Sequence, residues 1–145
     1  MIVLDASAFT ELLTVETGLS ERIRGSMMLD AHWCTTEHFR NEVANALRRL
    51  RLTNRLQRAK FEAGWAQLSS LDVDVWPTIP LLPRIGELYE NATAYDAAYV
   101  ALAEELGCAL LTADAKLSEI PGARCQFLGA TREQAAPTQP ERSGP

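Results

Sequence analysis

Four acidic residues of this sequence stand where carboxylates could together hold a metal ion. Asp5 ends one apolar run, Asp114 closely follows another, and Glu42 and Asp96 fall within two expected helices. Each acid also has a structural interpretation. Asp5 and Asp114 could cap the helical turns that follow them, and Asp96 suits the positive end of a helix dipole. The pattern therefore leaves open either four structural acids or one shared site.

Glu42 is the acid that a structural role explains least well. Val43 lies beside it and Phe39 about one turn before it, so Glu42 borders the apolar side of its helix. A carboxylate there is costly unless it is paired, bound to a cation or able to reach water. The metal-ligand and solvated interpretations are equally open. Glu37, the rival acid of this helix, is about 140° further around the axis, so both do not easily face one site.

A group of carboxylates without cysteine neighbours favours a hard, oxygen-preferring ion, Mg²⁺ or Mn²⁺. Such an ion can bind a phosphodiester and lower the pKa of a bound water, which points to phosphoryl chemistry. Zinc fits less well, because only His38 lies one turn from Glu42 and zinc usually takes several nitrogen or sulfur ligands. We expect His32, in a short strand, to be structural.

The three cysteines, Cys34, Cys108 and Cys125, are an odd number, and none lies at zinc-site spacing from a second cysteine or a histidine. We therefore expect buried thiols and a reducing, cytoplasmic setting. No segment approaches the roughly 20 apolar residues of a membrane helix. The apolar run 2–4 is too short for a signal peptide and has no basic residue before it.

The charge is unevenly distributed. The formal net charge is −5, yet residues 40–60 hold seven basic residues and one acid, while the rest of the chain holds seven basic residues and eighteen acids. A basic band on an acidic body is a candidate phosphate-binding surface, and a solvated helix face is the alternative. The band consists of Arg40, Arg48, Arg49, Arg51, Arg55, Arg58 and Lys60.

Strand and helix patterns alternate along the chain. This alternation predicts a three-layer α/β/α fold with a central parallel sheet of four to five strands. Ligands of such sheets bind beyond the carboxyl ends of the strands, so we expect Asp5 and Asp114 to meet there. Residues 1–130 are expected to form one domain, and the polar residues 131–145 a disordered tail. Expected strands lie at 2–4, 31–35, 73–76, 109–112 and 126–128, and expected helices follow Asp5 and span 18–27, 37–52, 54–69, 82–90 and 94–106.

Capping residues predict several helix ends. Thr93 is expected to begin the helix 94–106 and Gly107 to end it. Thr36 is expected to cap the helix 37–52. Thr53 or Asn54 is expected to cap the next helix, whose inner face is predicted at Leu56, Phe61, Trp65 and Leu68.

Motifs of other phosphate and acyl chemistries do not occur. The sequence has no Gly-x-x-x-x-Gly-Lys or Gly-x-Gly-x-x-Gly loop and no Gly-x-Ser-x-Gly elbow. A phosphatase of the haloacid dehalogenase kind has a second acid two residues after the strand-end aspartate, where this chain has Ser7.

Four segments in order carry a family resemblance. They are residues 3–8 (VLDASA), 42–49 (EVANALRR), 95–103 (YDAAYVALA) and 110–117 (LLTADAKL). Together they resemble the PIN-domain family, and within it the VapC-type toxins, over residues 2–128. The family's four acids fall without substitution on Asp5, Glu42, Asp96 and Asp114, and the hydroxyls that support its metal site fall on Ser7 and Thr112.

The resemblance implies a Mg²⁺- or Mn²⁺-dependent endoribonuclease, the toxin of a VapBC-type pair. It further implies cleavage of structured RNA (tRNA or ribosomal RNA) by metal-activated water, a cognate VapB-type antitoxin as inhibitor, and a homodimer. The basic band supplies the candidate RNA-binding residues Arg48, Arg49, Arg55 and Arg58. Two alternatives remain: a catalytically silent PIN module that binds RNA or protein, and a metal-dependent phosphatase on a similar sheet.

Overall fold

A computed structural model describes residues 1–130 of the chain. All strand pairs of its five-stranded sheet are parallel, and the strand order is β3-β2-β1-β4-β5. The predicted sheet is thereby confirmed. The tail expected at residues 131–145 lies outside the described residues. The strands are β1 (Ile2–Leu4), β2 (Trp33–Thr36), β3 (Asp74–Trp76), β4 (Ala109–Thr112) and β5 (Phe127–Gly129).

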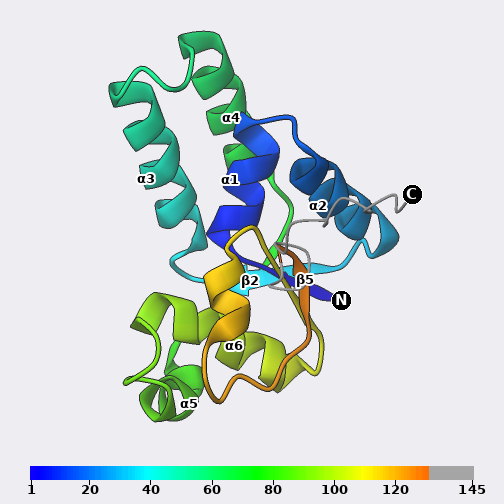
Figure 1. Ribbon diagram of the computed structural model, residues 1–145, viewed down its shortest axis with the longest axis vertical. Helices are drawn as coiled ribbons and strands as arrows, with labels where there is room; N and C mark the ends of the chain where they lie inside the picture. Colours follow the sequence, from blue (N-terminus) through cyan, green and yellow to red (C-terminus); the bar gives the residue numbers. More distant parts are fainter. Residues whose placement is uncertain (131–145) are drawn as a thin grey trace, which may run out of the picture.

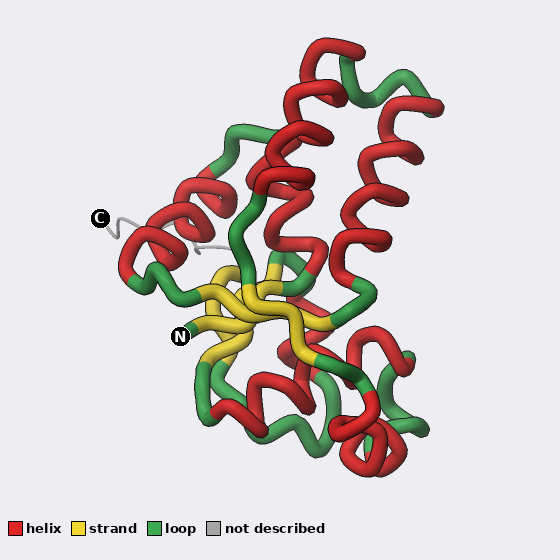
Figure 2. Tube along the Cα trace, turned by 180° about the vertical axis from the view of Figure 1, so that it is seen from behind, coloured by secondary structure: helices red, strands yellow, loops and turns green. Residues whose placement is uncertain are grey.

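Helices cover both faces of the sheet, as the alternation predicted (Figure 1). Four helices lie on one face: α1 (Ala6–Thr14), α2 (Gly18–Leu29), α3 (Phe39–Leu52) and α4 (Arg58–Ser70). The other face carries a short 3₁₀ helix, η1 (Ile79–Leu81), with α5 (Leu82–Glu87) and α6 (Ala94–Leu106). A second 3₁₀ turn, η2 (Ala115–Glu119), follows β4. Figure 2 shows α3 and α4 extending away from the sheet as a helical hairpin.

The central strands have no exposed face. Every residue of β1 is buried, and so are the last three residues of β4. Such strands read as unbroken apolar runs, which is why both were predictable from sequence. Because β1 and β4 are neighbours with Leu4 opposite Leu111, the residues that follow them emerge at the same edge of the sheet.

Helix α6 forms between the residues predicted to bound it. The Thr93 hydroxyl accepts a hydrogen bond from the Asp96 amide (3.2 Å), which satisfies one of the open N–H groups of the first turn. Gly107 ends the helix with φ +61°, a left-handed conformation that a side chain would strain. All seven residues from Ala97 to Ala103 are buried, so α6 is the central helix of its layer.

Two predicted helix starts are wrong. Thr36 belongs to β2, and α3 begins after His38 instead, with no side-chain cap. Helix α4 begins at Arg58, because the residues before it form a turn. In that turn the Thr53 hydroxyl donates back to the Arg49 carbonyl (2.8 Å), and Asn54 has φ +56°. Both polar residues therefore finish α3 and do not begin α4.

The predicted inner face of α4 is also partly wrong. Trp65 is 44% exposed, while Gly64 is buried and faces Leu47 of α3. Leu68 is buried on this face, as expected. Leu56 is buried too, but it lies in the turn before the helix. The close approach of α3 and α4 at Gly64 therefore sets the rotation of α4.

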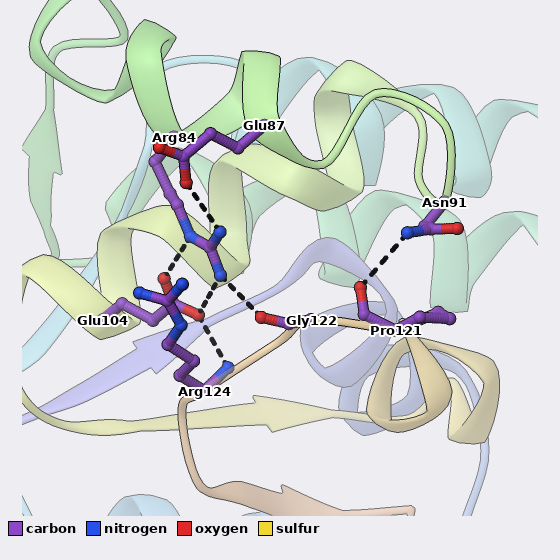
Figure 3. A network of polar contacts seen from close by, with 7 residues as sticks. All are labelled: Arg84, Glu87, Asn91, Glu104, Pro121, Gly122 and Arg124. Atoms are coloured by element: carbon purple, nitrogen blue, oxygen red, sulfur yellow. Dashed lines mark hydrogen bonds and ion pairs between the residues drawn. The ribbon is translucent and has the colours of Figure 1, made fainter.

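An ion-pair network ties the second helical layer together (Figure 3). The Arg84 guanidinium of α5 donates through Nε and Nη2 to the two oxygens of Glu104 in α6 (2.7 and 3.1 Å). It also donates to the Gly122 carbonyl (2.6 Å), and Glu104 accepts from the Arg124 amide (2.7 Å). One arginine thus joins two helices to the segment that leads into β5.

The structure shows the state of the cysteines and the length of the helices. All three cysteines are free thiols; Cys34 is buried, and Cys108 and Cys125 are partly buried. No helix among residues 1–130 is long and apolar enough to cross a membrane.

Candidate active site

Asp5 and Asp114 meet at the carboxyl edge of the sheet, as their positions predicted. Asp5 directly follows β1, and Asp114 lies two residues beyond β4. Both also have the capping role that sequence left open. One oxygen of Asp5 accepts from the Ala8 amide (2.8 Å), and Asp114 accepts from the Lys116 amide (3.0 Å). Capping fixes both carboxylates in place but leaves part of each available for a ligand.

Two hydroxyl groups hold the Asp5 carboxylate. Ser7 Oγ donates to Oδ1 (2.7 Å), and Thr112 Oγ1 donates to Oδ2 (2.5 Å). Ser7 Oγ in turn accepts from the Ala113 amide (3.0 Å), which fixes its rotamer. The two residues that the resemblance assigned a supporting role therefore contact Asp5 from β4 and α1.

The carboxyl group of Asp5 has a raised pKa. Its side chain is 4% exposed, and burial raises the pKa of its carboxyl to about 6. That value is a balance in which burial and the negative charge of Glu42 raise the pKa and the hydrogen bonds from Thr112, Ala8 and Ser7 lower it. Asp5 is thus an acid whose ionised form the fold disfavours, although three donors surround it.

Glu42 lies on the first turn of α3 and faces α6. Its Oε1 accepts from the Tyr99 hydroxyl (3.1 Å) and lies 2.9 Å from His38 Nε2. The His38 ring packs edge-on against Tyr95 and Tyr99, with centroids 5.1 and 4.9 Å away. Burial, followed by the charges of Glu42 and Asp5, raises the pKa of Tyr99, so its hydroxyl keeps its proton and remains a donor.

The remaining two acids complete this group. Burial and the charge of Glu42 raise the pKa of half-buried Asp96, and the charge of Asp114 raises it further. Glu42 therefore interacts with both Asp5 and Asp96, and Asp96 with Asp114. We call the four residues Asp5, Glu42, Asp96 and Asp114 the acidic crevice.

The donor set of the acidic crevice fits a hard divalent cation. Within residues 1–130, His38 is the only basic side chain that forms an ion pair with any of the four acids. Oδ2 of Asp5 accepts one hydrogen bond and so retains a lone pair. The carboxylates of the crevice are spread more widely than the ligands of a compact metal site: no three of their oxygens lie within 4.8 Å of one another. Among the described residues, three possible ligand atoms lie this close together at His32, Cys34 and Asp74. Mg²⁺ commonly retains several waters, so carboxylates at this spacing can hold it partly through water.

Of the four acids, Glu42 lines cavities of the described residues. A cavity of about 470 Å³ between α1 and α3 runs from Ser7 and Glu42 to Arg49. A second cavity of about 390 Å³ shares Arg49 and continues to Arg55. Of the predicted RNA-binding residues, Arg49 and Arg55 therefore line these cavities. Arg48 is exposed on α3, and Arg58 is paired with Glu62 (2.9 Å).

Sequence reasoning missed Tyr99 and Tyr95 as parts of the site. Tyr99 lies one helical turn after Asp96, so the spacing that placed Asp96 also places Tyr99 on that face. Tyr95 is 60% exposed and lines a third cavity, of about 460 Å³, with His38, Asn41, Glu42 and Asn45. Aromatic residues in an apolar helix are usually core, so their type alone did not separate them from packing residues.

Comparisons with known proteins place the chain in a family and match its fold. A family model described as "PIN domain" matches residues 2–123. The ribonuclease VapC9 of Mycobacterium tuberculosis is 38% identical over 125 residues, which cover 86% of this chain and 94% of that protein. Among solved structures, VapC20 of M. tuberculosis, a sarcin-ricin loop cleaving toxin, superposes with a TM-score of 0.62 at 18% identity. That alignment covers 83% of this chain and 95% of VapC20. VapBC2 from Rickettsia felis, bound to a promoter DNA fragment, superposes with a TM-score of 0.61 at 12% identity and covers 88% of this chain and 99% of that one.

Proposed function

This chain belongs to the PIN domain family, among its VapC-type ribonucleases, and on that premise we propose that it is a Mg²⁺- or Mn²⁺-dependent endoribonuclease that cleaves structured RNA. The observation that carries the proposal is the acidic crevice, whose Glu42 lines a cavity with Arg49, next to a second cavity that contains Arg49 and Arg55. Carboxylates to hold a cation and arginines to hold phosphates are the two requirements of such an enzyme. We propose tRNA or ribosomal RNA as the substrate class.

Neighbouring side chains orient two of the carboxylates that would bind the ion. Ser7 and Thr112 hold the Asp5 carboxylate in one rotamer. Tyr99 of α6 and His38, which precedes α3 four residues before Glu42, hold Glu42 in the same way. When bound, a divalent ion supplies positive charge to the phosphodiester and lowers the pKa of a coordinated water. Pre-oriented ligands reduce the reorganisation needed to place the substrate phosphate.

The residues of these cavities fit the RNA backbone. Arg49 stands along α3 from Glu42 and is exposed to solvent, so its guanidinium can contact a phosphate without being dehydrated first. On the other side of Glu42, exposed Tyr95 offers a ring face on which an unstacked base can lie. RNA would then cross the crevice between a phosphate contact and a stacking contact.

Metal dependence is the primary test. The full chain is incubated with transfer and ribosomal RNA in Mg²⁺, in Mn²⁺ and in EDTA, and we expect defined fragments with the ions and none with EDTA. Binding without cleavage in every buffer would favour the silent PIN module. Hydrolysis of a small phosphate ester but not of RNA would favour the phosphatase.

We also propose a VapB-type antitoxin as inhibitor. The fold match to VapBC2 supports it, and so does the acidic crevice, in which Glu42 alone has a basic partner among the described residues. An arginine or lysine of the partner can enter a pocket of carboxylates and compete with a cation. Inhibition should then weaken as Mg²⁺ is raised. Inhibition that is independent of Mg²⁺ would place the antitoxin at Arg49 and Arg55 instead.

A homodimer and a cytoplasmic setting complete the proposal. The second helical layer has exposed apolar side chains: Ile79, Leu82 and Tyr89 are each more than half exposed. Such a surface favours contact with another chain. Light scattering of the purified protein measures its oligomeric state. The three free cysteines support a reducing compartment, and fractionation of cells tests it.

A further inference from the structure

A second group of ligand side chains lies at the opposite edge of the sheet from the acidic crevice. His32 precedes β2, Cys34 lies within β2, and Asp74 opens β3. Residues two apart along a strand share a face, and Cys34 is directly opposite Asp74 in the strand register. The three side chains therefore converge. One ligand atom from each, a ring nitrogen, a sulfur and a carboxylate oxygen, lies within 4.8 Å of the others.

The contacts within this group show how its members are held. His32 Nε2 lies 2.6 Å from Asp74 Oδ2, and both side chains are more than half exposed. Cys34 is buried beneath them. Burial raises the pKa of the Cys34 thiol, and a hydrogen bond with the Trp76 side chain opposes that rise. A donor beside the sulfur also stabilises a thiolate when a metal binds it.

We propose that His32, Cys34 and Asp74 form a Zn²⁺ site with three protein ligands and a water in the fourth position. Zinc accepts nitrogen, sulfur and carboxylate oxygen together, whereas Mg²⁺ prefers oxygen alone. Two zinc ligands at about 2.1 Å stand roughly 3.4 Å apart in a tetrahedron. His32 and Asp74 must therefore separate by less than about 1 Å, which exposed side chains can do by small torsional changes. On binding, the Cys34 thiol gives its proton to solvent and the His32–Asp74 hydrogen bond is lost.

The two sites are separate in space and in chemistry. By the register of β1 with β2, Asp5 is level with Thr36, four residues beyond His32, or roughly 13 Å along the strand. The acidic crevice offers mainly carboxylates, while the proposed zinc site contains a thiol and an imidazole. Saturating Mg²⁺ therefore leaves the zinc site open to a softer ion.

Zinc at this site would clamp β2 to β3. His32 and Asp74 are 42 residues apart in sequence, and the segment between them contains the whole α3–α4 hairpin with Glu42 and Arg49. The ligands converge only in the folded chain, so Zn²⁺ stabilises the fold by mass action. The spacing of cysteine and histidine could not reveal this site, because its third ligand comes from a neighbouring strand.

Cobalt provides a direct readout, because Co²⁺ occupies zinc sites and a thiolate ligand gives it a charge-transfer absorption band in the near ultraviolet. The full chain, reduced and in excess Mg²⁺, is titrated with Co²⁺. We expect one equivalent to produce the band and Zn²⁺ to abolish it. The band should be absent in Cys34→Ser. Binding should be at least about tenfold weaker in His32→Ala and Asp74→Asn.

Matched controls keep the test decisive. Cys125→Ser removes a thiol before β5, and Asp96→Asn removes a carboxylate of the acidic crevice; both should retain the band. If Cys34→Ser does not fold, the exposed positions His32 and Asp74 still carry the test, and Zn²⁺ should raise the melting temperature of the wild type but much less that of either variant. A wild type without the band, or a band unchanged in all three ligand variants, would overturn the proposal.

Discussion

Replacing Asp5 with asparagine tests the electrostatics of the acidic crevice most sharply. Burial raises the pKa of Asp5 to about 6, against about 4 in an unfolded chain. Two pKa units correspond to about 3 kcal/mol, which is the cost of ionising Asp5 in the folded protein at pH 7.5. Asparagine removes that charge but exchanges an oxygen near Thr112 for an amide, which costs about 1 kcal/mol. The variant should gain about 2 kcal/mol.

The assay is thermal melting in EDTA and in Mg²⁺ as a function of pH. A gain of about 2 kcal/mol raises the melting temperature of Asp5→Asn above wild type by about 6 °C at pH 7.5 in EDTA. Between about pH 4 and pH 6 the folded wild type binds more protons at Asp5 than the unfolded chain does, so its stability falls as pH rises through that window. The advantage of the variant should therefore be greatest above pH 6 and disappear below pH 4.

Metal reverses the comparison. At a hundred times the dissociation constant, an ion stabilises the wild type by about 2.7 kcal/mol, or about 8 °C, and Asp5→Asn should lose most of that rise. Asp72→Asn, at an exposed position before β3, is the matched control and should respond to Mg²⁺ as wild type does. An equal Mg²⁺ response in Asp5→Asn and wild type would show that Asp5 is not a ligand. A variant that melts well below wild type in EDTA at pH 7.5 would refute the assigned pKa.

Three further changes address catalysis, RNA binding and the helical layer. Asp96→Asn should fold normally and cleave RNA at least about a hundredfold more slowly, about 2.7 kcal/mol of barrier, measured by initial rates. The double variant Arg49→Ala, Arg55→Ala should weaken binding of all RNAs and flatten the dependence of log K on log salt by somewhat under about two units. Arg84→Leu should lower the free energy of unfolding by about 2–3 kcal/mol in urea melts, because it leaves Glu104, which is 14% exposed, without its cation.

Each of these changes has a control on the same structure. Glu37→Gln should cleave RNA normally, since Glu37 instead accepts from the Thr78 amide; normal cleavage by Asp96→Asn would remove Asp96 from the site. Arg58→Ala should leave the salt slope nearly unchanged, because Arg58 pairs with Glu62. If the Arg49, Arg55 double variant has the same salt slope as wild type, these arginines are solvated side chains that do not contact RNA phosphates. Arg84→Leu that unfolds like wild type would show that the network in Figure 3 adds no stability.

The elements that sequence predicted well are those in which local signals agree. The strands β1 and β4 are unbroken apolar runs, and α6 has a capping threonine at one end and a glycine at the other. The sequence signals of each element, the apolar run of a strand or the caps of a helix, agree with the state that the fold requires, so these elements are recognisable without knowledge of their partners.

Helix α4 shows why the remaining elements could not be predicted. Its hydropathy pattern allows an inner face with Trp65 or one with Gly64, and a hydropathy count favours the tryptophan. In the structure Gly64 lies on the inner face of α4. A β-carbon at this position would lie 3.6 Å from the Leu47 side chain, so a larger residue would separate α4 from α3. The choice depends on a contact between two helices, which no property of α4 alone contains.

The residues of the candidate site also differ in how far sequence could place them. The edge of a parallel sheet brings Asp5 and Asp114 together whatever the helices do, so strand prediction was enough to place both. Glu42 and Asp96 approach them only through the rotations of α3 and α6. Tyr99 and His38 could be recognised as partners of Glu42 only once those rotations were known.

The acidic crevice is difficult to explain as a means of stabilising the fold. Ionising Asp5 costs about 3 kcal/mol, out of a typical folding stability of 5–15 kcal/mol. Three donors surround Asp5 without offsetting that cost, and a buried polar group can often be replaced by an apolar one with no loss of stability. A buried acid with a raised pKa, at a strand end and beside a second acid, is the arrangement expected of the proposed ligand site. A cation between Asp5, Glu42, Asp96 and Asp114 would turn the repulsion among them into the attraction that holds it.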